Sequence, residues 1–114
     1  MTDKQIETMD ARALKTALDD GRELRLLDAR LPEQFEEGHL PGAVLATSDT
    51  IIEQAGRLIP DRSTTVVTYC GRLSCRRSSR AAERLAGLGY HAIEFPGGLE
   101  EWRENGYPVE TTRS

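Results

Sequence analysis

Short apolar segments and longer amphipathic segments alternate along the chain, and the two kinds differ in period. The short segments are rich in aliphatic and β-branched residues and have the length of ordinary strands. The longer segments place apolar residues three or four positions apart, as in a helix with one buried face. We expect strands over residues 24–28, 43–46, 64–69 and 91–95, helices over residues 11–20, 32–37, 80–88 and 99–105, and a further helix that Ser48 or Asp49 caps and that reaches Leu58.

The order of these segments predicts the fold class. Regular alternation of strands and helices is typical of a parallel sheet with helices on both faces. We therefore expect an α/β fold with a central parallel sheet of about five strands. Ligands of such sheets bind beyond the carboxyl ends of the strands. Cys70 and Asp28 each stand at such an end, so we expect the chemistry of the protein at that edge.

Length, charge and cysteine content narrow the class of protein. We expect one domain over residues 1–114, because this length suits a single folded unit. A net charge of −4 gives no support to a nucleic-acid or membrane partner, and no apolar run approaches the roughly 18 residues of a membrane span. Residues 1–7 are polar and lack the apolar core of a secretory signal. Two cysteines are too few for a disulfide framework, so we expect a reducing compartment, the cytoplasm.

The segment that follows the strand at residues 64–69 carries the strongest chemical signal. Cys70 lies where this strand has ended and a helix, expected to begin at about Ser78, has not yet begun. Arginines follow at positions 72, 76, 77 and 80, although the chain as a whole is acidic. Guanidinium charges and a helix N-terminus favour the nucleophilic thiolate, and loop amides can also hold an anion. We therefore predict that Cys70 is a nucleophile in an anion-binding loop, with substrate contacts drawn from Gly71, Arg72, Leu73, Ser74, Cys75, Arg76 and Arg77.

Three separated segments carry a resemblance to a known family. The first, LDARLPEQFEEGHLPGA at residues 27–43, combines an Asp-x-Arg motif with Gly-His-Leu-x-Gly-Ala. The second joins the Tyr-Cys pair and its loop to a helix with Ala81 and Ala82. The third, PGGLEEWRENGYP at residues 96–108, has a closing Gly-Gly, Trp and Gly-x-Pro. Because the segments occur in the expected order and cover nearly the whole chain, the chain resembles a single-domain rhodanese, a sulfurtransferase domain.

The resemblance implies a ping-pong sulfur transfer without a cofactor or metal. Cys70 would take the outer sulfur of thiosulfate, or of a similar small anionic donor, as a persulfide. Cyanide, a thiol or an unidentified protein acceptor would then remove that sulfur. Sulfur suits this role because it is both a good nucleophile and a good leaving group. Backbone amides of residues 71–76 would hold the negative charge, with Arg72 and Arg76 as candidate clamps for the donor oxygens and Arg77 as a substitute for either.

Two other functions stay open on the sequence alone. The loop is longer than in the usual rhodanese pattern, because Gly71 follows Cys70 directly and Ala81 comes only eleven residues after Cys70. The spacing Cys70-x5-Arg76 matches that of arsenate reductases and cell-cycle dual-specificity phosphatases, which act on tetrahedral oxyanions. Against this alternative, Tyr69 stands where those phosphatases have His, and the loop has no Asp as a general acid. A catalytically silent rhodanese-like module that only binds a partner is the other alternative.

Several of these residues also have purely structural interpretations. Cys70 could be a small hydrophobic residue at a strand end. Cys75 is an inert residue at a helix start, a resolving thiol that forms a disulfide with Cys70, or a residue that shapes the loop. Asp28 and Arg30 either satisfy backbone and charge at a strand end or support the cysteine loop. His39 lies in the segment GHLPG at residues 38–42 and is expected to fix a turn by hydrogen bonding. No spacing of Cys and His in the chain resembles a zinc site.

Overall fold

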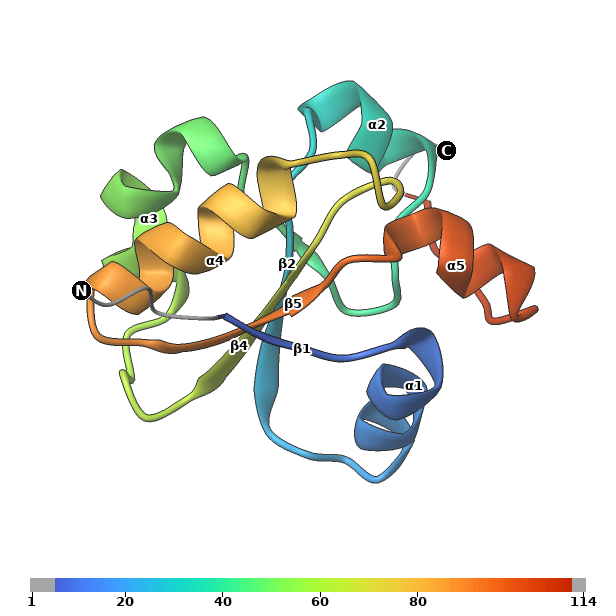
Figure 1. The fold of residues 1–114 in the computed structure, drawn as a ribbon, viewed down its shortest axis with the longest axis horizontal. Coiled ribbons are helices and arrows are strands. Elements are labelled where there is room, and N and C mark those ends of the chain that lie inside the picture. The colour runs from blue at the N-terminus through green and yellow to red at the C-terminus, as the bar shows by residue number, and fades with distance from the viewer. Residues whose placement is uncertain (1–5, 112–114) are drawn as a thin grey trace.

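The computed structural model describes residues 6–111 and shows a sheet covered by helices (Figure 1). The elements follow one another in the order β1 (Glu7–Thr8), α1 (Ala11–Asp19), β2 (Leu24–Asp28), α2 (Pro32–Glu37), β3 (Val44–Leu45), a 3-10 turn (Ser48–Thr50), α3 (Ile51–Leu58), β4 (Thr65–Tyr69), α4 (Arg77–Gly87), β5 (His91–Phe95) and α5 (Gly98–Glu104). The strands form one sheet in the order β1-β5-β4-β2-β3, and every neighbouring pair is parallel. The predicted α/β fold with a five-stranded parallel sheet is confirmed.

The register of the sheet aligns the carboxyl ends of its three central strands. Asp28 at the end of β2 pairs with Tyr69 at the end of β4, and Tyr69 pairs with Phe95 at the end of β5. Cys70 follows Tyr69 directly and is therefore the first residue after β4 at this edge of the sheet. The sheet therefore brings Cys70 and Asp28 to the same edge, as the strand assignments predict.

Each face of the sheet has its own hydrophobic core, because successive strand residues point to opposite faces. The face covered by α3 and α4 buries Leu27 and Val66, and the face covered by α1 and α5 buries Leu26, Val67 and Trp102 (Figure 1). Burying one such aliphatic side chain contributes about 1.5–3 kcal/mol. The predicted placement of helices on both faces is thus confirmed. Within residues 6–111, no helix has the length and apolar character that crossing a bilayer requires.

The helix expected to reach Leu58 begins later than its capping residues indicate. Ser48–Thr50 forms a 3-10 turn, and α3 starts only at Ile51. Single 3-10 turns are common at helix starts because they tighten the first turn. The Arg84 side chain of α4 donates to the carbonyl of Ser48 and so fixes the turn from outside the segment. This tertiary contact is not visible in the local pattern of the sequence.

One strand was not expected from the sequence. β1 consists of two residues at the edge of the sheet, where Glu7 pairs with Ile93 and Thr8 with Glu94. Two residues are too few to show the alternation of apolar and polar side chains by which a strand is recognised. Both β1 residues are exposed, so no buried apolar side chain marks this strand in the sequence either.

Gly98 is the point at which α5 approaches the segment after β4. Its φ of +61° lies in the left-handed region, and a Cβ atom there would overlap the carbonyl oxygen of Cys70 and lie 2.8 Å from the carbonyl carbon. The close approach allows the N–H of Leu99 to donate to the Cys70 carbonyl at 3.0 Å. Only glycine satisfies both the backbone conformation and the space at this position.

We expect Gly98→Ala to lower the free energy of unfolding by about 3 kcal/mol or more, because alanine would combine a strained φ with a backbone overlap. Urea unfolding measures this loss. Gly21→Ala is the matched control: Gly21 has a φ of +73°, and no described atom lies within 4 Å of the position of its Cβ. The control should lose only about 1–2 kcal/mol from the strained φ. Equal losses in the two variants would contradict the importance of the contact with Cys70.

Candidate active site

A cavity of about 650 Å³ lies at the carboxyl edge of the sheet, between the loop after β4 and the helices α2 and α5. Cys70 lines it, although only 1% of this residue's surface is exposed. The cavity is thus the part of the surface from which a small molecule can approach the cysteine. Its walls are formed by Arg30, Leu31, Gln34, Cys70, Gly71, Arg72, Cys75, Arg77, Leu99, Glu100, Arg103 and Glu104.

Cys70 and Cys75 form a disulfide across the loop. Their Cα atoms are 6.2 Å apart, which is a usual separation for bonded cysteines. The N–H of Cys75 donates to the carbonyl of Arg72 at 3.0 Å, and this turn brings Cys75 back toward Cys70. Of the three interpretations of Cys75, the structure shows the disulfide with Cys70. Reduction of this disulfide frees both thiols at the cavity.

Helix α5 holds the first two residues of the loop. The carbonyl of Cys70 accepts from the N–H of Leu99 at 3.0 Å, and the carbonyl of Gly71 accepts from the N–H of Glu100 at 2.8 Å. By contrast, the N–H groups of Gly71, Arg72, Leu73 and Ser74 make no hydrogen bond within residues 6–111. Amide groups of this kind are suited to holding an anion.

The arginines after Cys70 occupy different positions. Arg72 and Arg77 line the cavity, whereas Arg76 is exposed and lies outside the wall. Arg77 is the first residue of α4 and is half-buried. Within the described residues its buried Nη1 has no hydrogen-bond partner, and the exposed carboxylate of Asp49 lies 3.6 Å away. Arg77 therefore brings a positive charge to the cavity that its neighbours neutralise only in part.

The cavity wall includes residues that no motif in the sequence indicates. Gln34 comes from α2, and Arg103 comes from α5 together with three of its neighbours on that helix. These residues are far from Cys70 in the sequence, so only the fold brings them to the site. Leu73 and Ser74, which we expected among the substrate contacts, are exposed at the tip of the loop and outside the wall, and Leu73 is 74% exposed.

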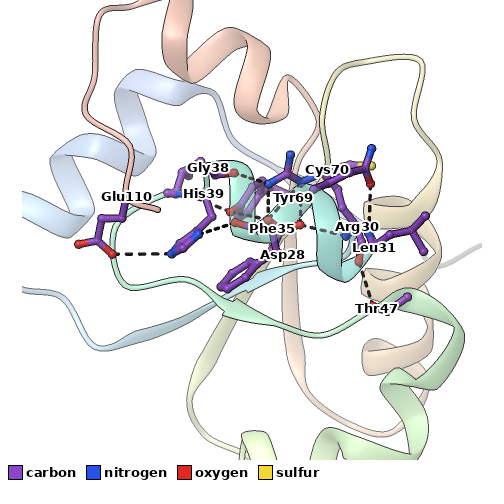
Figure 2. Close-up of polar contacts among 12 residues, drawn as sticks. Asp28, Arg30, Leu31, Phe35, Gly38, His39, Thr47, Tyr69, Cys70 and Glu110 are labelled. Carbon is purple, nitrogen blue, oxygen red and sulfur yellow. Dashed lines mark hydrogen bonds and ion pairs between the residues drawn. The ribbon is translucent and has the colours of Figure 1, made fainter. Parts of the chain in front are cut away.

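A buried ion pair supports the edge of the sheet beneath the loop (Figure 2). The carboxylate of Asp28 accepts from Arg30 Nη2 at 2.7 Å, from its Nε at 3.0 Å and from its backbone N–H at 2.9 Å. The hydroxyl of Tyr69 donates to Asp28 at 2.9 Å and accepts from the N–H of Leu40 at 3.0 Å. Arg30 Nη2 also donates to the carbonyl of Gly38 at 2.6 Å. This network joins the ends of β2 and β4 to the turn after α2.

The network also fixes the charge state of its members. Burial and the charge of Asp28 raise the pKa of Tyr69, so the hydroxyl remains protonated and donates. Burial acts to lower the pKa of Arg30, but the hydrogen bonds and charge of Asp28 raise it overall. Arg30 is therefore always positive, and most of its charge is offset by Asp28 at 2.7 Å.

The charges around the cavity favour a small anion. Four arginines and two glutamates line it, although the chain as a whole has a net charge of −4. A thiol in the wall of such a cavity is suited to attack an anion that the arginines hold in place. The geometry therefore suits nucleophilic chemistry by Cys70 once its disulfide is reduced.

His39 belongs to the turn after α2 and not to the cavity wall. Its Nδ1 lies 2.8 Å from the carbonyl of Phe35, and its ring stacks on that of Phe35 with the centroids 3.8 Å apart. Its backbone N–H donates to the carbonyl of Glu110 at 2.9 Å. The expected role of His39 in fixing this turn is confirmed by these contacts (Figure 2). Within the described part of the chain, no group of three or more His, Cys, Asp or Glu is arranged to hold a metal ion.

Comparison with known proteins agrees with these features. The chain matches the rhodanese-like domain family over residues 10–105. It is similar to the thiosulfate sulfurtransferase PspE of Escherichia coli, with 35% identity over 75 residues that cover 66% of this chain and 70% of PspE. It is also similar to the thiosulfate sulfurtransferase GlpE of Pseudomonas syringae, with 34% identity over 89 residues that cover 77% of this chain and 79% of GlpE.

Solved structures support the same assignment. The solution structure of a rhodanese-like domain from Anabaena sp matches this fold with a TM-score of 0.83 and 26% identity, covering 96% of this chain and 85% of that domain. The resemblance drawn from the three sequence segments is thus confirmed, and the chain belongs to the rhodanese-like domain family.

Proposed function

We propose that the protein moves a sulfane sulfur from thiosulfate, or from a similar small anionic donor, to a thiophilic acceptor through a persulfide on Cys70. The family and the sulfurtransferases among its relatives support sulfur transfer as the class of reaction. The position of Cys70 carries the proposal: this residue is buried at a strand end and lines one cavity with Arg72 and Arg77. A dianionic donor in this cavity would have two positive charges beside the thiol that attacks it.

The chemistry begins with the reduced form of the site. The Cys70 thiolate attacks the outer sulfur of thiosulfate, and a new S–S bond forms as the S–S bond of thiosulfate breaks. Sulfite leaves with the bonding electron pair. Cyanide or a thiolate then attacks the outer sulfur of the persulfide, and Cys70 departs as the thiolate. Each step exchanges one bond to sulfur for another, so the two steps need no cofactor.

The surrounding groups have separate tasks in this proposal. Arg72 and Arg77 hold the donor oxygens by charge-assisted hydrogen bonds. The N–H groups of Gly71 and the residues after it stabilise the negative charge of the persulfide. The Asp28 network holds the start of the loop in place, because it fixes Tyr69, which immediately precedes the nucleophile.

The spacing Cys70-x5-Arg76 supports a second candidate, chemistry on arsenate or a phosphate ester. Such oxyanions need an arginine that closes the loop around them, but Arg76 is exposed and outside the cavity wall. The hydroxyl of Tyr69 donates to Asp28 and is buried, so it does not supply the acid that a phosphate ester needs. Sulfite is a stable leaving group that needs no acid. Sulfur transfer therefore fits the site better than oxyanion chemistry.

We expect Cys70→Ser to abolish transfer from thiosulfate to cyanide, whereas Cys75→Ser should keep a measurable fraction of it. The reason is that Cys70 is buried where the chain leaves β4, whereas Cys75 is only half-buried and lies further along the loop. Thiocyanate formation by the proteins, kept reduced by a dithiol, measures the activity. The mass of the Cys75→Ser protein after incubation with thiosulfate should show one added sulfur, located on Cys70. A folded but inactive Cys75→Ser protein would contradict this assignment.

Replacing Arg72 or Arg77 with Ala should raise the Michaelis constant for thiosulfate. Losing a charged hydrogen bond is worth about 1.5–3 kcal/mol, or about ten- to a hundredfold in kcat/KM. Arg76→Ala removes the same charge from an exposed position outside the wall, so it serves as the matched control with a much smaller effect. Steady-state kinetics at two salt concentrations check the prediction. An effect of Arg76→Ala as large as that of Arg77→Ala would show that the loop holds the donor differently.

The reduced protein should discriminate sharply among three substrates supplied at matched concentration. We expect turnover of thiosulfate with cyanide, and negligible turnover of an aryl phosphate or of arsenate with a thiol reductant. The physical reason is that Arg76 lies outside the wall and the loop after Cys70 contains no Asp that could act as the general acid. Hydrolysis of the aryl phosphate that is lost in both Cys70→Ser and Arg76→Ala would establish the second candidate instead.

A further inference from the structure

We propose that Cys75 is a resolving thiol, which attacks the Cys70 persulfide, releases hydrogen sulfide and forms the Cys70–Cys75 disulfide. The inference rests on the proposed transfer of sulfur to Cys70. It adds a second reaction to that transfer, the reduction of thiosulfate to sulfite and sulfide at the expense of a dithiol. Cys75 thereby becomes a second catalytic residue.

The first observation is that the side chain of Cys75 reaches the Sγ atom of Cys70. The disulfide shows that the Sγ atom of Cys75 can bond to the Sγ atom of Cys70 within the folded protein. The turn closed by the N–H of Cys75 and the carbonyl of Arg72 holds this arrangement from the backbone. The disulfide is therefore compatible with a loop whose first two carbonyls, those of Cys70 and Gly71, are also held by N–H groups of α5.

The disulfide also indicates which sulfur Cys75 attacks. In a persulfide, the inner sulfur is the Sγ atom of Cys70, and the outer sulfur is the one that came from the donor. Attack on the outer sulfur would pass it to Cys75 without forming a disulfide. Attack on the inner sulfur forms the observed bond and expels the outer sulfur. The structure shows contact between the two Sγ atoms, which is the product of the second route.

The reaction balances without any group beyond the two cysteines and a dithiol. The persulfide Cys70–S–SH and the thiol of Cys75 give Cys70–S–S–Cys75 and H₂S. With the transferred sulfane sulfur counted as zero-valent, it gains two electrons and leaves as sulfide, and the two cysteine sulfurs together supply those electrons. A dithiol then reduces the disulfide by thiol–disulfide exchange and is itself oxidised to a disulfide. The sum is thiosulfate plus dithiol to sulfite, hydrogen sulfide and the oxidised dithiol.

Cys75 has an advantage over an acceptor from solution. Cys70 has only 1% of its surface exposed, so an external thiol must first enter the cavity. Cys75 already lines that cavity. An oriented group within the same molecule reacts as if it were present at very high concentration. The charges of Arg76 and Arg77, which follow Cys75 directly, also favour attack by a thiolate.

A single-turnover experiment without any acceptor tests the inference. The full chain is reduced, freed of reductant under anaerobic conditions and mixed with thiosulfate. We expect the wild-type protein to release about one sulfite and one sulfide per chain, to lose both free thiols and to become two hydrogens lighter than the reduced chain. We expect Cys75→Ser to release sulfite, to gain one sulfur in mass, and to yield at least about tenfold less sulfide.

A displaced thiol provides the matched control. Ser63 is exposed and lies just before β4, at the opposite end of that strand from Cys70. The double variant Cys75→Ser/Ser63→Cys has the wild-type number of thiols, but the second one is at the wrong edge of the sheet. It should behave like Cys75→Ser at low protein concentration, retaining the added sulfur and releasing little sulfide.

The outcomes separate this inference from the function on which it rests. Sulfite release with a stable wild-type persulfide would overturn the role of Cys75 and leave transfer to Cys70 intact. Sulfur that stays on the chain but moves to Cys75 would also overturn it, as would equal sulfide from the wild type and Cys75→Ser. Absence of sulfite from both proteins would overturn the proposed function itself, and the role of Cys75 with it.

Discussion

The carboxylate of Asp28 is fully buried, and its contacts reach several parts of the chain at once. It binds Arg30 through two guanidinium nitrogens and a backbone N–H, and it accepts from the hydroxyl of Tyr69. A buried charge is costly unless it is paired, and removing one partner of such a pair typically costs about 3–5 kcal/mol. The ends of β2 and β4 and the turn at Gly38 are therefore held to one another. Because Cys70 directly follows Tyr69, this constraint also determines where the cysteine loop begins.

The site is built on that fixed edge from segments that are distant in sequence. The glycine at position 98 lets α5 approach the loop closely enough to bind the carbonyls of Cys70 and Gly71. Helix α4 then places Arg77 at the cavity, and α5 contributes Arg103 to its wall. A rigid sheet edge, a tightly held loop start and positively charged walls together give a small anion a defined position beside a sulfur nucleophile. The proposed persulfide chemistry needs these features and no cofactor.

Much of the fold could be predicted from the sequence, because its signals are local. The strands at residues 24–28 and 91–95 were predicted with their observed bounds, and the helix at residues 32–37 was recognised by its starting proline. The position of Cys70 at a strand end followed from the same reasoning. By contrast, the two residues of β1 form a strand only because β5 lies beside them.

The details of the site depended on tertiary geometry. The sequence could not distinguish Arg76 from Arg77, because the direction of each side chain depends on where α4 begins. It could not reveal Arg103, which reaches the cavity only through the packing of α5. The pairing of the cysteines was one of three open interpretations of Cys75, because spacing alone does not fix the path of a loop.

The fate of each sulfur atom of thiosulfate tests the central claim most directly. Thiosulfate radiolabelled at either its outer or its inner sulfur is supplied to the reduced Cys75→Ser protein, and the protein is then digested under non-reducing conditions. The account predicts that the outer label is covalently bound to the peptide containing Cys70 and that the inner label is released as sulfite. Retention of both labels together, or of neither, would contradict it, because the site would then bind the donor as an intact anion or not at all.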